Sequence, residues 1–300
     1  MVSIIISSPY SEITSLAKNI NETISEPYEL IWIENPQRKY NLSQAYNLGA
    51  SKAQYPILCF IHDDVLFAEK NWGKVLVQLF EDPNVGLVGV SGSKHASLLQ
   101  AGWWGYSVER YHRYSIFHST NKGSEQMLLN PDNEDFTKVV VLDGVFLATR
   151  HSIWKEILFD EQLTGFHGYD IDFSINVSTR FDVLVSYQIP LIHSSRGKID
   201  NNWLEANFKV FKKWKNSLPL NILKESKSVE RNALNKNLQF LMYTLIYNSL
   251  NKWELSKIFI RYSLTFGFNM KLFRWVGNYV LLGRKENFLI KQLMDSLYEK

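Results

Sequence analysis

The sequence contains only one cysteine among its 300 residues, so the chain cannot form an internal disulfide bond. A lone thiol is typical of a protein in a reducing cytosol. Cys59 lies in the apolar run 56–61, which indicates a small buried side chain rather than a nucleophile. No stretch reaches the roughly 18 apolar residues that span a bilayer. Residues 1–8 have neither a basic leader nor a cleavage site, so we expect no signal peptide and a cytoplasmic protein.

The chain also lacks a large excess of charge of either sign. The net charge of +3 is too small to indicate a nucleic-acid partner. The 45% of hydrophobic residues suffices for a substantial buried core and excludes a disordered chain. Aromatic residues make up 14% of the chain, and although their rings can stack on sugars, we expect most of them in the core.

Apolar runs alternate with helix-patterned segments through the first two thirds of the chain. We expect strands at 2–7, 28–33, 56–61, 85–90, 139–142, 145–149 and 183–189, with helices at 11–24, 43–53, 71–80, 151–157 and 171–179. This alternation predicts an α/β fold with a mainly parallel, Rossmann-like sheet flanked by helices. Ligands bind such sheets beyond the carboxyl ends of the strands, where the polar residues are therefore of interest.

Two other regions have different patterns. Residues 91–138 are rich in Gly, Ser, His and aromatics with little periodicity, which predicts a long functional loop or lid. Within it, the Trp-rich cluster 102–106 either floors a binding pocket or packs in the core. From Trp203 onward the pattern is helical, and we expect four or five helices. The chain thus divides into an α/β domain over residues 1–200 and a helical region over 201–300.

Two adjacent aspartates, Asp63 and Asp64, follow the buried strand 56–61 and His62. Unpaired carboxylates at a ligand-binding edge repel each other and need a cation. Mg2+ and Mn2+ prefer oxygen ligands and can bridge a carboxylate to a diphosphate. Capping of the next helix is an equal alternative for the pair taken alone.

The preceding residues make the pattern specific. Ala45-Tyr46-Asn47-Leu48-Gly49 is an Ala-x-Asn-x-Gly segment that leads into the strand and the aspartates. This stretch resembles the signature of family-2-type glycosyltransferases of the GT-A fold. The resemblance implies a nucleotide-sugar donor, a divalent cation (Mn2+ or Mg2+) and an acceptor that is a glycan or a lipid-linked molecule. It places Asn47 among the residues that bind the donor.

The same resemblance implies roles at the strand ends. Asp64 takes the position of the metal-binding carboxylate, Asp63 is a donor-binding middle residue, and His62 stands where the family often has its first Asp. Ser8, at the end of the first strand, and Glu34, at the end of the second, are assigned to donor binding. Glu34 replaces an Asp that faces the base or ribose, and turn formation is an equal alternative for Ser8.

A second motif reads Phe159-Asp160-Glu161, followed by Gly165-Phe166-His167-Gly168-Tyr169-Asp170-Ile171-Asp172-Phe173. It resembles the family's Phe-Asp-Glu segment and its Glu-Asp-x-Asp helix start, whose first Asp is the catalytic base. Asp170 aligns with that base, and Tyr169 replaces the usual acidic neighbour. A carboxylate at a helix N-terminus is stabilised as the anion and can still accept a proton, although a capping role is the alternative. We expect Asp172 to secure the helix.

Further candidates lie on either side of this motif. Gly144 resembles a small residue of the acceptor-side strand and would leave space beside the reacting sugar, while Asp143 either contacts the acceptor or ends a turn. His193 stands where several relatives have a metal-binding histidine, and an imidazole ligand favours Mn2+ over Mg2+. A structural histidine is an equal alternative. Arg196, with Lys198 nearby, is assigned to hold the diphosphate.

The helical tail interleaves basic residues with aromatics. One interpretation is a peripheral surface on the inner face of an anionic membrane, close to a lipid-linked acceptor. The other is a subdomain that packs on the catalytic domain or forms a homodimer, and it is favoured because aromatic stripes at helical spacing are more often core.

The resemblance therefore implies an inverting, hexosyltransferase-type glycosyltransferase in bacterial polysaccharide or glycan synthesis. Two alternatives stay open. A nucleotidyltransferase would usually have a Gly-rich basic loop after its first strand, whereas Ser7-Ser8-Pro9-Tyr10 offers none. A catalytically silent carbohydrate- or nucleotide-binding protein would explain the departures at His62 and Tyr169.

Overall fold

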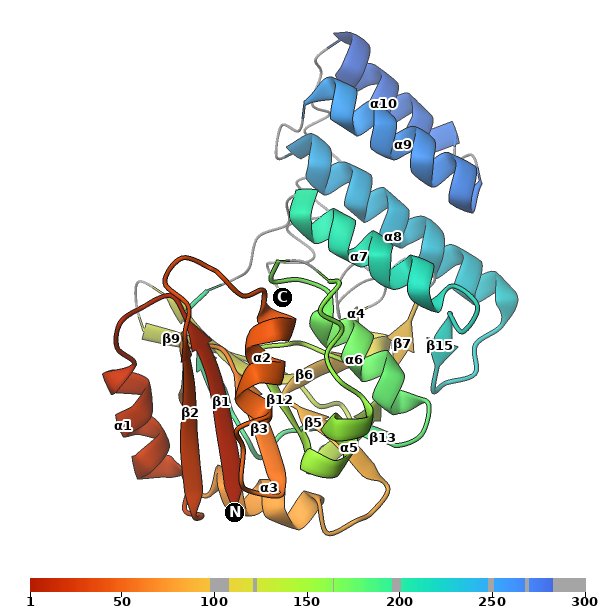
Figure 1. Ribbon diagram of the computed structural model, residues 1–300. Coiled ribbons are helices and arrows are strands. Elements are labelled where there is room, and N and C mark those ends of the chain that lie inside the picture. The colour runs from red at the N-terminus through yellow and green to blue at the C-terminus, as the bar shows by residue number, and fades with distance from the viewer. Residues whose placement is uncertain are drawn as a thin grey trace. The chain divides into compact units, whose positions relative to one another are not determined.

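A computed structural model describes residues 1–97, 108–120, 123–163, 165–195, 201–247, 251–267 and 270–282 (Figure 1). The chain forms two compact units, Met1–Glu230 and Arg231–Lys300. The first unit therefore extends past the boundary that the sequence predicts at residue 200.

The first unit is built on a seven-stranded sheet. Its order is β10 (Phe136–Val139), β13 (Asp182–Ser186), β5 (Val85–Gly89), β12 (Phe146–Arg150), β3 (Ile57–Ile61), β1 (Val2–Ser8) and β2 (Tyr28–Glu34). β12 runs antiparallel to β3 and β5, and β10 runs antiparallel to β13, whereas the other pairings are parallel. The predicted α/β fold is confirmed, and the sheet is mixed. A continuous apolar run such as β12 reports burial on both faces but not strand direction.

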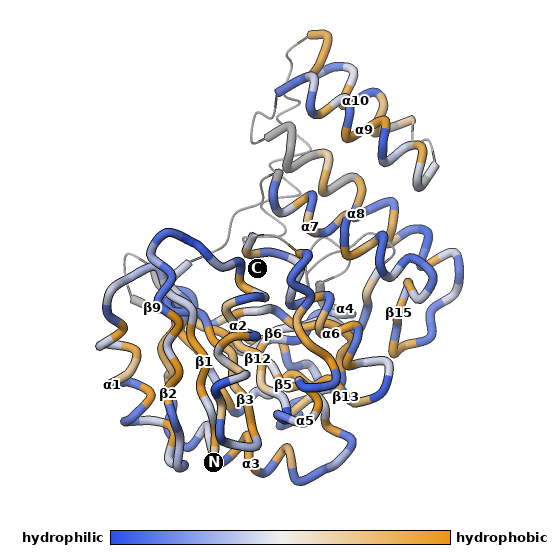
Figure 2. The backbone as a smooth tube through the Cα atoms, viewed as in Figure 1, coloured by the Kyte–Doolittle hydropathy of each residue, from blue (hydrophilic) through white to orange (hydrophobic). Residues whose placement is uncertain are grey.

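Helices flank this sheet: α1 (Thr14–Thr23), α2 (Leu42–Ala50), α3 (Trp72–Leu79), α5 (His151–Glu156) and α6 (Tyr169–Ser178). Alternate residues of β3 enter two separate cores, because successive side chains of a strand point to opposite faces. Cys59 packs in the cluster that contains Trp72 of α3, and Phe60 packs in the cluster that contains Tyr46 of α2. Figure 2 shows the concentration of hydrophobic residues along β1 and β2.

The Ala-x-Asn-x-Gly segment lies on α2. This helix starts with a capping box, in which Asn41 accepts from the N–H of Gln44 at 2.9 Å and the Gln44 side chain accepts from the N–H of Asn41 at 3.0 Å. Near its end, a Cβ atom on Gly49 would overlap the side chain of Ile5 on β1. The glycine of the motif therefore allows α2 to approach the sheet closely.

The segment 91–138, predicted as an irregular loop, instead contains several strands. Three of them, β6 (Ser91–Ser93), β8 (His112–Thr120) and β9 (Gly123–Leu129), belong to a second sheet. Its order is β11 (Val141–Leu142), β6, β8, β14 (Leu191–His193) and β4 (Val65–Phe67), with β9 paired to β8. Ser and His residues weaken the hydrophobic alternation that identifies strands, so the pattern concealed them. The Trp-rich cluster 102–106 lies outside the described residues.

A further helix, α7 (Asn201–Trp214), joins the first unit through α6. Asp172 of α6 is only 2% exposed, and it accepts hydrogen bonds from Lys213 Nζ at 2.9 Å and from Trp214 Nε1 at 2.7 Å. Val210 shares a hydrophobic cluster with Ile171. Asp172 was expected to secure its own helix, whereas its carboxylate binds two side chains of α7.

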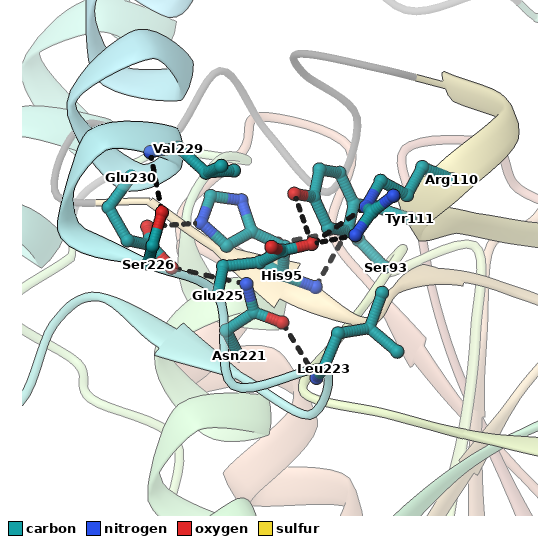
Figure 3. A network of polar contacts seen from close by, with 10 residues as sticks. All are labelled: Ser93, His95, Arg110, Tyr111, Asn221, Leu223, Glu225, Ser226, Val229 and Glu230. Atoms are coloured by element: carbon teal, nitrogen blue, oxygen red, sulfur yellow. Dashed lines mark hydrogen bonds and ion pairs between the residues drawn. The ribbon is translucent and has the colours of Figure 1, made fainter.

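A network of polar contacts holds the last residues of the first unit, up to Glu230, against the rest of that unit (Figure 3). It connects β7 (His95–Ala96) and the short α4 (Val108–Tyr111) to the segment between β15 (Leu220–Asn221) and the start of α8 (Lys227–Tyr247). His95 Nε2 lies 2.6 Å from the Glu230 carboxylate, which also accepts from Asn221 at 3.1 Å. Arg110 donates from Nε to Glu225 at 2.7 Å. These contacts explain why the compact unit ends at the first turn of α8.

The second unit contains the rest of α8 together with α9 (Lys252–Phe266) and α10 (Met270–Leu282). With α7, the described residues after 200 hold four helices, which agrees with the predicted four or five. The rings of Phe259 on α9 and Phe273 on α10 lie 6.2 Å apart. Within the described residues, none of the helices has the length and apolar character required to span a bilayer.

Candidate active site

The candidate residues gather at one edge of the seven-stranded sheet. Ser8 at the end of β1 pairs with Glu34 at the end of β2, and Ile6 of β1 pairs with Ile61 at the end of β3. β12 runs the other way, so its first residue, Phe146, pairs with Ile61. The carboxyl ends of three strands and the loop before β12 therefore meet at one edge.

Asp64 and His193, the two predicted metal ligands, lie side by side. The antiparallel pairing of β14 with β4 sets His193 opposite Val65, and the N–H of Ser194 donates to the Asp64 carbonyl at 3.0 Å. As a result, His193 Nε2 is 3.3 Å from Asp64 Oδ1. Two residues far apart in the sequence are brought together by two short strands.

His62 completes a cluster of three side chains that could hold a metal ion. Its Nδ1 lies 4.0 Å from Asp64 Oδ1, and its ring lies 5.8 Å from the ring of His193. One ligand atom from each of His62, Asp64 and His193 lies within 4.8 Å of the others. Two imidazoles and a carboxylate are donors that fit a divalent ion such as Mn2+.

The cluster is strongly coupled electrostatically. Burial alone would raise the pKa of Asp64, but the neighbouring His193 imidazole holds it well below its usual range. Burial opposes the charged form of His193 too, yet the Asp64 carboxylate raises the pKa of this histidine. Burial lowers the pKa of His62, and the nearby His193 adds to the effect. His62 is therefore kept neutral, the form in which an imidazole nitrogen can bind a metal.

Asp63 turns toward β1 rather than toward this cluster. Its Oδ2 accepts a hydrogen bond of 2.6 Å from the hydroxyl of Ser8, which in turn accepts from the N–H of Tyr10 at 3.1 Å. Ser8 is fully buried, so its hydroxyl supports Asp63 and the turn instead of facing a ligand. This placement favours the turn-forming alternative for Ser8, and its contact with the donor stays a prediction. Glu34 lies exposed at the same sheet edge.

Asn47, assigned to donor binding, is held by contacts within the protein. Its amide nitrogen donates to the Phe159 carbonyl at 2.9 Å and to the Glu161 carboxylate at 3.0 Å. Its oxygen accepts from Trp154 Nε1 and from the N–H of Phe159, both at 3.1 Å. These four bonds use the full capacity of the amide. Asn47 therefore fixes the segment 159–161, which leads into the second motif, and has no group left for the donor.

Asp170 is the second residue of α6, two residues after the N-cap Gly168, whose φ of 80° is in the left-handed region. Its Oδ2 accepts from the N–H of Gly144 at 3.1 Å. Burial raises the pKa of Asp170 to about 7, and the nearby Asp143 carboxylate contributes to the shift. A carboxylate that titrates near neutral pH is suited to general-base catalysis.

Tyr169 links the loop residue that binds this carboxylate to the cluster of His62, Asp64 and His193. Its hydroxyl donates to the Gly144 carbonyl at 3.0 Å and lies 2.9 Å from Nε2 of His62. A Cβ atom on Gly144 would overlap this hydroxyl. The space beside Gly144, expected to receive the reacting sugar, is thus filled by Tyr169, and that expectation is corrected.

The contact between His62 and Tyr169 was missed in the sequence. Both residues stand where the resembled family has acidic side chains, and two departures at separate motifs are a signal that the two positions could touch. Arg196 and Lys198, predicted to hold a diphosphate, lie outside the described residues.

Comparisons with known proteins agree with the fold. A model of a glycosyltransferase-like family matches residues 2–214. A search of curated protein sequences finds no match. The structure is similar to that of GalNAc-T7 with UDP, GalNAc and Mn2+, with 12% identity, a TM-score of 0.51 and coverage of 72% of this chain and 49% of that one. This chain thus spans about half the length of the GalNAc-T7 chain.

It is also similar to S. aureus TarS, residues 1–349, in complex with UDP-GlcNAc. Here the identity is 11%, the TM-score is 0.53, and the match covers 95% of this chain and 93% of that one. At such identities the likeness to solved structures shows the fold alone. The family match covers most of the chain, including both acidic motifs and His193. The protein therefore belongs to the glycosyltransferase-like family and has the GT-A fold.

Proposed function

We propose that this protein transfers a sugar from a nucleoside-diphosphate sugar to an acceptor hydroxyl, with a divalent cation bound by Asp64 and His193. One observation carries the proposal. The paired ligands and Asp170, a carboxylate with a pKa of about 7, belong to one set of contacts that runs through His62 and Tyr169. A cation site and a base at a single sheet edge are the two parts that sugar transfer requires.

The donor would bind along the ends of β1, β2 and β3. The carboxylates of Glu34 and Asp63 lie at these strand ends and would accept hydrogen bonds from a ribose or a base. Similar GT-A structures contain UDP, or UDP-GlcNAc, which supports UDP-sugars as the first donors to test. Arg196 stays a prediction for the diphosphate.

The reaction would be a single displacement with inversion at the anomeric carbon. Asp170 accepts the proton of the acceptor hydroxyl while the hydroxyl oxygen attacks that carbon. The bond from the anomeric carbon to the diphosphate oxygen breaks, and the nucleoside diphosphate leaves. The cation, when bound, neutralises the negative charge that develops on this leaving group.

The acceptor is proposed to be a glycan or a lipid-linked molecule in bacterial polysaccharide synthesis. The helical tail is proposed to serve in packing, dimerisation or contact with the inner face of a membrane. Exposed apolar side chains on α9, such as Trp253 and Leu264, are consistent with each of these three roles.

Release of nucleoside diphosphate tests the proposal. The purified protein is incubated with Mn2+ and a panel of nucleotide sugars without acceptor, and the free diphosphate is measured. We expect slow hydrolysis of one donor class that EDTA removes and that Asp64→Ala abolishes. Asp135→Ala, which removes an exposed carboxylate of the β9–β10 connection, is the matched control and should keep the activity. Tight donor binding without turnover, even when acceptors are added, would favour a silent binding protein.

A further inference from the structure

The two side chains that depart from the family pattern contact each other. His62 replaces an acid in the first motif, Tyr169 replaces an acid in the second, and their polar atoms lie 2.9 Å apart. The two substitutions therefore form one structural feature, and the hydrogen atoms of this contact determine what His62 can do.

The Gly144 carbonyl fixes the direction of the hydrogen bonds. A carbonyl can only accept, and the single hydroxyl hydrogen of Tyr169 is donated to it at 3.0 Å. The Tyr169 oxygen is then left with its lone pairs, so the contact with His62 requires a hydrogen on Nε2. The opposite arrangement would leave the buried Gly144 carbonyl without this donor.

A neutral imidazole with its hydrogen on Nε2 has a free lone pair on Nδ1. This Nδ1 is the atom that faces Asp64, at 4.0 Å from Oδ1. His193 approaches the same oxygen at 3.3 Å from another direction. The lone pair and the carboxylate oxygen are both hydrogen-bond acceptors and repel each other, and a cation bound between them would satisfy both groups.

We propose that His62 binds the divalent cation through Nδ1, and that Tyr169 is a positioning residue that holds this imidazole in the required tautomer. The proposal rests on the proposed function, in which Asp64 and His193 bind the same ion. Metal-binding histidines generally need a partner for the second ring nitrogen, and here a phenol relayed to a backbone carbonyl fills that role. With two imidazoles and one carboxylate, the site would prefer Mn2+ to Mg2+.

Binding of Mn2+ alone tests this assignment without reference to activity. Electron paramagnetic resonance gives the free Mn2+ concentration, and hence the Kd, in the absence of donor. We expect His62→Gln and Tyr169→Phe each to raise the Kd for Mn2+ by about 10- to 100-fold. Tyr187→Phe, which removes a hydroxyl bonded to Thr137 at 3.2 Å outside the cluster, is the matched control and should leave the Kd unchanged.

A spectroscopic signature separates ligation from general stability. Electron spin echo modulation from 14N should report two imidazoles on Mn2+ in the wild-type protein and one in His62→Gln. His62→Asp, which restores an oxygen ligand, should recover affinity with a lower ratio of Mn2+ to Mg2+ binding. Thermal unfolding without metal confirms that each variant is folded.

The outcomes separate a failure of this inference from a failure of the proposed function. If Asp64→Ala abolishes Mn2+ binding while His62→Gln and Tyr169→Phe bind as tightly as wild type, His62 is not a ligand and only this inference fails. If the wild-type protein binds no Mn2+ at millimolar concentration, both the inference and the metal-dependent function fail.

Discussion

The backbone N–H of Gly144 donates to the carboxylate of Asp170 at 3.1 Å, which joins the loop before β12 to the first turn of α6. The same glycine accepts from Tyr169 through its carbonyl. One residue in the loop before β12 thus orients both the proposed base and the tyrosine that contacts His62.

Replacement of Asp170 by Asn should abolish the base while preserving the shape of the site. The amide oxygen can still accept from Gly144, but the side chain cannot take a proton at neutral pH. We expect transfer to fall by about 10²- to 10⁴-fold, with the Kd for the nucleotide unchanged. Transfer rates and calorimetric binding of UDP measure the two effects, and transfer at the wild-type rate would exclude the assigned role.

The titration of Asp170 should also appear in the pH dependence of stability. Its pKa is about 7 in the folded protein, compared with about 4 for an unfolded chain. The folded state therefore holds this proton more tightly, so the stabilisation is complete below pH 4 and is lost as the pH rises through 7. In EDTA, the Tm of Asp170→Asn relative to wild type should rise between pH 4 and 7. A Tm difference that does not change with pH would contradict the assignment.

Gly144→Ala should disturb Tyr169 rather than create a simple steric block to the acceptor. The new methyl group would overlap the tyrosine hydroxyl, which must move away from His62. We expect weaker Mn2+ binding in the variant even when no sugar is present. Gly86→Ala, at another close contact on β5, is a control for packing damage. If Gly144→Ala binds Mn2+ normally but loses acceptor-dependent turnover, the glycine instead shapes the acceptor site.

Asp172→Ala should destabilise the first unit because it leaves the indole N–H of Trp214 without its partner and removes a contact of Lys213. We expect a loss of about 1–3 kcal/mol in the free energy of unfolding, measured by urea denaturation. Glu156→Ala removes an exposed ion pair with Arg180 and should cost about 0–1 kcal/mol. Equal losses for the two variants would mean that α7 is not anchored through Asp172.

Asn47→Ala distinguishes the structural position of this residue from its predicted place at the donor. It removes four hydrogen bonds to residues 154–161. We expect about 1–3 kcal/mol lower stability, because the buried partners are left unsatisfied. The Kd for UDP should be unchanged in the folded variant. A stable protein with weakened UDP binding would restore the original assignment.

The sequence predicted the elements that follow from local patterns. Continuous apolar runs identified β1 and β3, and the polar residues after them placed Asp64 at the sheet edge. The direction of β12 was not predictable, because burial on both faces is the same for a parallel and an antiparallel strand. The second sheet was missed because β8 and β9 combine Ser, His and Gln with few alternating apolar residues.

Contacts between side chains that are far apart in the sequence could not be predicted from local patterns. Asp172 and Trp214 are 42 residues apart, and their hydrogen bond ties α7 to α6 within the first unit. His62 and Tyr169 are 107 residues apart. Each looked like a departure from the family pattern when considered alone, and only the fold shows that they are partners.

The burial of Cys59 in β3 has a practical consequence. The thiol is inaccessible, and burial raises its pKa well above the ordinary value, so it should not react with maleimides in the native protein. Any cysteine introduced on the surface would then be the single reactive thiol of the folded chain. A fluorophore or spin label could be attached beside the proposed donor edge without first removing the natural cysteine, so that binding can be followed by spectroscopy in an otherwise unaltered protein.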